Sequence, residues 1–75
     1  MSKIHEQLLD TFLTTFDHPR KQIRRQTLLR IFSLDEAYVE EILKSLEQRL
    51  EAASNEVAKA RLEKLREVIR LYKDI

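Results

Sequence analysis

Glycine is absent from this 75-residue chain, which also lacks cysteine and tryptophan and has a single proline. Average proteins carry about 7% glycine, because tight hairpins, bulges and other turns need its freedom to adopt positive φ angles. The absence argues against a β-rich fold. It also excludes phosphate-binding loops, dinucleotide-binding fingerprints and nucleophile elbows, since each of these sites depends on glycine.

The lack of cysteine excludes a disulfide framework and a thiolate metal site. Long hydrophobic runs are missing as well, because the longest uninterrupted apolar segment has three residues, 37–39. Neither a membrane span nor the apolar part of a signal peptide fits in so short a run. We therefore expect no membrane partner and a cytoplasmic location.

Apolar residues still make up 43% of the chain and charged residues 36%, with a formal net charge of +1. This balance is typical of a soluble globular protein. The length leaves room for one compact domain, residues 1–75, and excludes a two-domain enzyme. A core of this size rarely contributes more than about 3–5 kcal/mol of stability, so we expect self-association into a homo-oligomer.

Apolar residues recur at helical spacing through most of the sequence and predict an all-α bundle of three or four helices. Ser2 is a candidate N-cap for the first helix, and Pro19 suits the first turn of the second, with Asp17 or His18 capping it. The run 28–32 is apolar on nearly all sides and is expected to be buried. The phenylalanines Phe12, Phe16 and Phe32 are expected in the core. The expected helices cover residues 3–16, 19–32, 34–53 and 55–73.

Ser33 and Glu36 match a capping box, in which Ser33 accepts a hydrogen bond from a backbone amide and starts the third helix. Beyond it the apolar spacing changes phase near Ser54 and Asn55, which are weak helix formers and good caps. A helical hairpin that turns there is the preferred interpretation. The alternative is one C-terminal helix of about 38 residues, which would have to dimerise to bury its apolar seam.

Side chains for catalysis or metal binding are scarce. His5 and His18 lie thirteen residues apart and form no helical ligand pair, so His5 is interpreted as a surface residue and His18 as a helix cap. The acids of residues 35–56 are ascribed to favourable helix-dipole and i,i+4 interactions. We expect no catalytic residue, no metal ligand, no cofactor and no enzymatic activity.

Charge is distributed in blocks, with net charges of −2 in residues 1–17, +5 in 18–31, −5 in 32–56 and +3 in 57–75. Most cations of the second block fall in the first turns of a helix, where the positive end of the helix dipole disfavours them. Residues that are unfavourable for the local stability of a helix often serve a function instead. The basic block consists of Arg20, Lys21, Arg24, Arg25 and Arg30.

Three explanations of the basic block stay open at this point. Acids of the next helix, such as Glu40, Glu41 or Glu47, could neutralise it within the chain. It could bind an acidic surface of another protein. It could also bind nucleic acid, because Gln22 and Gln26 accompany the cations in a pattern like that of a recognition helix. Two features argue against nucleic acid: the corner before this helix lacks glycine, and the acidic third helix would repel phosphates.

An apolar stripe on the last two segments has two interpretations, namely the core of a bundle or a helix–helix interface with another chain. Taken together, the sequence predicts a small non-catalytic regulatory or adaptor protein that binds another protein through an apolar helical face and the basic block. The alternative is a small nucleic-acid-binding helical protein. The candidate interface residues are Leu43, Leu46, Leu50 and Val57.

Overall fold

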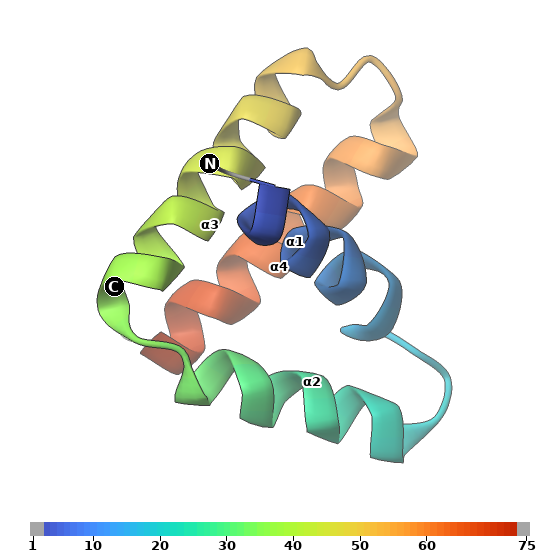
Figure 1. Ribbon diagram of the computed structural model, residues 1–75. Helices are drawn as coiled ribbons and strands as arrows, with labels where there is room; N and C mark the ends of the chain where they lie inside the picture. Colours follow the sequence, from blue (N-terminus) through green and yellow to red (C-terminus); the bar gives the residue numbers. More distant parts are fainter. Residues whose placement is uncertain (1–2, 74–75) are drawn as a thin grey trace.

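The computed structural model describes residues 3–73, which form four helices and, within that range, no strand (Figure 1). The all-α fold is thus confirmed, as is the hairpin of two helices in place of one long C-terminal helix. Each boundary lies within two residues of the predicted one. The helices are α1 (Lys3–Thr15), α2 (Lys21–Ser33), α3 (Glu36–Ala52) and α4 (Glu56–Lys73).

The helices pack around one apolar core. In Figure 1, α1 lies in front of α4, α3 runs along the left side and α2 crosses the bottom. α1 packs mainly on α3, and α2 packs mainly on α4, so these contacts join helices that are not adjacent in the sequence. The adjacent helices α3 and α4 also pack closely, as a hairpin. The buried apolar side chains are Leu9, Phe12, Phe16, Ile31, Val39, Ile42, Leu46, Leu62, Leu65 and Ile69.

Spacings of three and four residues explain why α1, α3 and α4 each bury one stripe, as the sequence pattern predicts. α2 is different, because it buries only Thr27 and Ile31. The hydroxyl of Thr27 lies 2.7 Å from that of Thr15, which joins α2 to the end of α1 through a polar contact. α2 therefore covers an edge of the bundle with one narrow face.

This edge position corrects the prediction that residues 28–32 are buried. Leu29 is 59% exposed and Phe32 is 64% exposed, while only Ile31 among these five residues is buried. The prediction was wrong because neighbouring helices cover just one side of α2. Phe12 and Phe16 lie in the core as expected, but Phe32 does not.

The start of the third helix also differs from the prediction. Ser33 ends α2, and its hydroxyl donates to the carbonyl of Arg30 at 2.9 Å. Leu34 is extended, so the next side chain able to cap is Asp35, which accepts from the amide of Tyr38 at 2.9 Å. The capping box at Ser33 is therefore wrong by two residues. Ser2, the predicted cap of the first helix, lies outside the described residues.

Asn55 ends the hairpin turn and caps α4. Its side-chain oxygen accepts from the amides of Val57 at 2.8 Å and Ala58 at 3.3 Å. This agrees with the phase change that the sequence shows at this position. Within residues 3–73, none of the four helices combines the length and the apolar character that crossing a bilayer requires.

Candidate binding interface on α2 and α4

The cations of the basic block have different surroundings. Arg24 is half-buried, and its Nη1 donates to the carbonyl oxygens of His18 at 2.7 Å and Pro19 at 3.0 Å. Its guanidinium thus stabilises the corner between α1 and α2. His18 accepts from the amide of Arg20 at 3.0 Å through Nδ1, so it supports the corner and not the helix amides beyond it.

Arg30 lies on the side of α2 that faces α1. With residues of α1 and Tyr38 it lines a shallow hollow of about 250 Å³. With Gln26, Thr27 and part of α1 it also lines a smaller one of about 170 Å³. Arg30 is therefore separated around the helix from Lys21 and Arg25.

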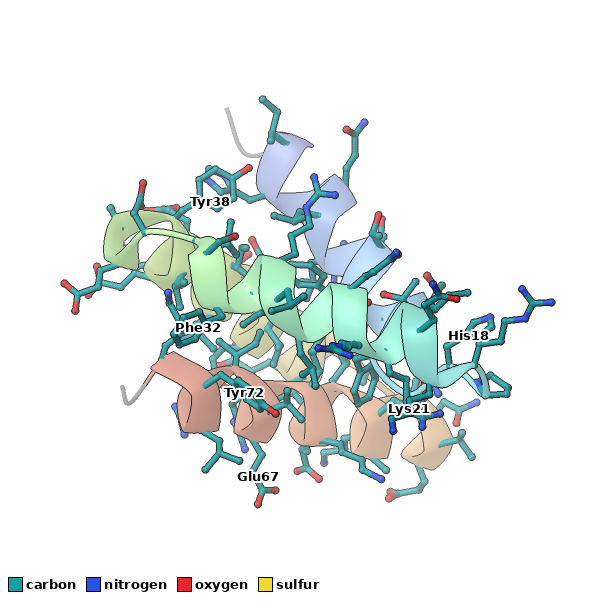
Figure 2. All side chains as sticks on the ribbon, turned by 90° about the horizontal axis from the view of Figure 1, so that it is seen from below. His18, Lys21, Phe32, Tyr38, Glu67 and Tyr72 are labelled. Atoms are coloured by element: carbon teal, nitrogen blue, oxygen red, sulfur yellow. The ribbon has the colours of Figure 1, made fainter. Side chains whose placement is uncertain are left out.

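Lys21 and Arg25 are exposed and lie one helical turn apart. Figure 2 shows Lys21 on the edge of α2 that borders α4, with Phe32 on the same edge at the other end of the helix. Leu29 lies between Arg25 and Phe32 at spacings of four and three residues. We call these four exposed residues, Lys21, Arg25, Leu29 and Phe32, the α2 stripe.

The cations of the basic block have no acidic partner among residues 3–73. The ion pairs instead join Arg49 to Glu6 and Asp10, Arg61 to Asp17, Arg66 to Glu47, and Lys44 to Glu41. Two of the three acids proposed for internal neutralisation are therefore paired elsewhere, and Glu40 forms no ion pair within the described range. Neutralisation by direct ion pairs is wrong for the described residues.

At the start of α2, no acid among the described residues offsets these charges. The first turn contains no acid, and the N-cap Arg20 makes no side-chain capping bond. Each exposed cation at this positive end of the helix dipole is unfavourable by about 0.3–1 kcal/mol. Arg20, Lys21 and Arg25 therefore lower the stability of α2. Arg24 is compensated by its hydrogen bonds, and Arg30 lies in the last turn, where the helix dipole favours a cation.

The other end of the α2 stripe is held against α4. The Lys73 ammonium lies 5.8 Å from the centre of the Phe32 ring and donates to the carbonyl of Phe32 at 2.8 Å. It also donates to the carbonyl of Leu34. Tyr72, 41% exposed, projects on the same side of the molecule as Phe32 (Figure 2). Exposed aromatic side chains from two helices thus lie together at the apolar end of the α2 stripe.

The four candidate interface residues of the last two helices do not share one exposed face. Leu46 is fully buried in the core of its own chain, and Leu43 and Leu50 are partly buried against that core. Val57 is 71% exposed on α4. Leu43 also forms the floor of a shallow hollow on the outer side of α3, together with Glu40, Lys44, Glu47 and Gln48.

His5 is not the solvated surface residue that the sequence suggested. Its ring centre lies 4.5 Å from that of Tyr38, and its Nδ1 is buried without a hydrogen-bond partner among the described residues. The start of α1 packs against the start of α3, which the local sequence does not reveal. Within residues 3–73, no three His, Asp or Glu side chains gather in an arrangement able to hold a metal ion.

Phe32 and Tyr72 are the interface candidates that sequence reasoning missed. One signal was available, because α2 carries apolar residues on more sides than one packed face can bury. No protein-family model, no curated protein and no solved structure matches the chain.

Proposed function

We propose that this protein is a non-catalytic binding protein that engages an acidic surface of another protein through the α2 stripe. One observation carries the proposal. Lys21 and Arg25 are exposed without an acidic partner among the described residues, and they lie in line with the exposed Leu29 and Phe32. The stripe is positively charged at one end and apolar at the other. It therefore suits a partner surface on which an acidic region lies next to an apolar one.

The two halves of the stripe would contribute differently. Exposed cations accelerate encounter with an acidic partner and disfavour basic ones, whereas they add little affinity at high salt. Leu29, Phe32 and the adjacent Tyr72 would supply the apolar and aromatic contacts in which binding energy concentrates. Lys21 and Arg25 also cost stability in the free protein because they lie near the positive end of the helix dipole, which favours a role in binding over a role in folding.

Nucleic-acid binding is the second candidate, because Gln22 and Gln26 are exposed beside Lys21 and Arg25 on a helix that follows a tight corner. Two features weigh against it. The second half of the exposed helix face is apolar, and Lys73 lies over the ring of Phe32, which obstructs stacking of a base on that side.

The test compares four purified chains as baits in a native cell lysate at about 50 mM and about 300 mM salt. They are the wild type, Lys21→Glu with Arg25→Glu, Phe32→Ser, and a matched control with Lys59→Glu and Arg70→Glu. The control residues are exposed on α4 and outside every ion pair of the described range. Circular dichroism first checks that each variant retains its helices.

The proposal requires an acidic protein that the wild type and the control retain at low salt and that both stripe variants lose. Equal capture by all four baits would contradict it. Fluorescence anisotropy with a duplex DNA and a single-stranded RNA tests the second candidate. Log-linear loss of affinity with salt, at a slope of about −0.7 to −0.9 per phosphate contacted, would favour nucleic acid.

A further inference from the structure

The outer side of α3 carries a pattern opposite to that of the α2 stripe. Glu40, Glu47 and Glu51 are exposed, and Leu43 forms an apolar floor between the first two of them. We call Glu40, Leu43, Glu47 and Glu51 the α3 stripe. Its members follow one another at spacings of three, four and four residues, which places them along one side of the helix.

The two stripes match in length and in register. In each stripe the last member follows the first by eleven positions, or about 16 Å along a helix at 1.5 Å per residue. The spacings of the α2 stripe are four, four and three, the reverse of those of the α3 stripe. Two antiparallel helices would therefore bring every member of one stripe opposite a member of the other.

The chemistry of the antiparallel pairs is complementary. Lys21 would face Glu51 and Arg25 would face Glu47, so both cations meet carboxylates. Leu29 would face Leu43 in its shallow hollow, and Phe32 would lie beside the methylene groups of Glu40. The positive N-terminal end of α2 would also lie next to the negative C-terminal end of α3, which is the favourable orientation of two helix dipoles.

These stripes do not meet within one chain. α2 and α3 lie along different sides of the molecule and join at a corner (Figure 1). No ion pair among the described residues connects them, and the only internal partner of the α3 stripe is Arg66, which pairs with Glu47. Glu47 is still about half exposed and has a second oxygen free to accept.

We infer that the α2 stripe of one copy binds the α3 stripe of a second copy, with the helices antiparallel. This inference rests on the proposed function, since it uses the same cationic surface and names its acidic partner. The interface joins two different surfaces, so the first copy keeps its α3 stripe free and the second copy keeps its α2 stripe free. Such head-to-tail contacts build rings where the rotation closes and open chains where it does not.

The association is weak and depends on salt. Two helix faces about 16 Å long cover much less than the about 800 Å² per partner of a standard stable interface. The cation–carboxylate pairs lie in one half of this narrow contact, and salt screens them over about 10 Å at 0.1 M. Self-association should therefore appear at high protein concentration and low salt.

A charge exchange between positions 21 and 51 tests the register. Lys21→Glu alone and Glu51→Lys alone each place like charges opposite one another, and both should raise the concentration needed for association about 5-fold or more. The chain that carries both substitutions restores an attractive pair between copies and should regain association. The matched control combines Lys21→Glu with Glu63→Lys, whose acid is exposed on α4, and should show no recovery.

Sedimentation velocity from about 5 to 500 µM, at about 50 mM and about 500 mM salt, measures the weight-average mass. A wild type that stays monomeric throughout would overturn the inference, as would association that the single substitutions leave unchanged or that the exchange does not recover. Lysate capture that still depends on Lys21 and Arg25 would then leave the proposed function standing. If the protein does not self-associate and lysate capture does not depend on Lys21 and Arg25, both the inference and the proposed function are contradicted.

Discussion

Arg24 donates to the carbonyl of His18 at 2.7 Å, whereas the side chain of Arg25, the next residue in the chain, is exposed and makes no hydrogen bond to the described residues. Two neighbouring residues of one type therefore have separate roles. Arg24 belongs to the corner between α1 and α2, and Arg25 belongs to the proposed binding surface. The same basic block thus contains a structural cation and exposed ones.

Arg24→Met should lower the free energy of unfolding by about 1–2 kcal/mol, because two hydrogen bonds from a charged donor are lost. Arg25→Met should change it by no more than about 0.5 kcal/mol, since no contact is removed and an unfavourable dipole interaction disappears. Urea unfolding followed by circular dichroism gives both values. Equal losses in the two variants would contradict this division of roles.

Asp35→Ala should destabilise the protein by about 0.5–2 kcal/mol, because Asp35 caps the first turn of α3. Ser33→Ala serves as the comparison, and it should cost less than about 0.5 kcal/mol, because its exposed hydroxyl only donates back to the preceding turn. Thermal melts of both variants measure the difference. A larger loss in Ser33→Ala would restore the capping box that the sequence suggested.

Ile31 and Phe32 are adjacent in α2, but one is fully buried and the other is 64% exposed. Ile31→Ala should cost about 2–5 kcal/mol through lost burial and a residual cavity. Phe32→Ala should cost at most about 1 kcal/mol, mainly from its contact with Lys73. Chemical denaturation distinguishes the two, and a Phe32→Ala loss as large as that of Ile31→Ala would mean that Phe32 lies in the core.

Arg49 connects α3 to α1 through Asp10 and Glu6, and its hydrogen bond to Asp10 is the main cause that raises the pKa of Arg49. A raised pKa in the folded protein means that the stabilisation is complete below the unfolded value and is lost only in strong alkali. Arg49→Met should therefore destabilise by about 1 kcal/mol at low salt, equally at about pH 7 and pH 9. Unfolding curves at both values, repeated at about 1 M salt where the loss should shrink, provide the check. A loss that changes between these pH values would contradict this assignment.

The helices could be predicted from the sequence because three of the four bury a single stripe, and such a stripe appears directly in the spacing of Leu and Ile. α2 shows what spacing alone does not reveal. Its apolar residues surround the helix, and only the packing of α1 and α4 decides that Ile31 is covered while Leu29 and Phe32 are exposed. The same packing separates Arg30 from Lys21 and Arg25, which the sequence had grouped together.

Capping was predicted less well because several side chains near a helix start compete for it. Ser33, Asp35 and Glu36 all have suitable groups, and the choice depends on where α2 ends. α2 continues through Ser33, so the cap moves to Asp35. Asn55 was easier to anticipate, because the apolar phase changes beside it.

The ion pairs of α1 also bear on the order in which the chain acquires its structure. Glu6, Asp10 and the nearby Asp17 bind Arg49 and Arg61, which follow them by 39 to 44 residues. During synthesis, α1 therefore emerges long before its partners and keeps Phe12 and Phe16 exposed until α3 and α4 follow. Because these contacts are distant in sequence, we expect slower folding than in a bundle whose adjacent helices pair, and a chain ending at residue 55 should show no cooperative melt.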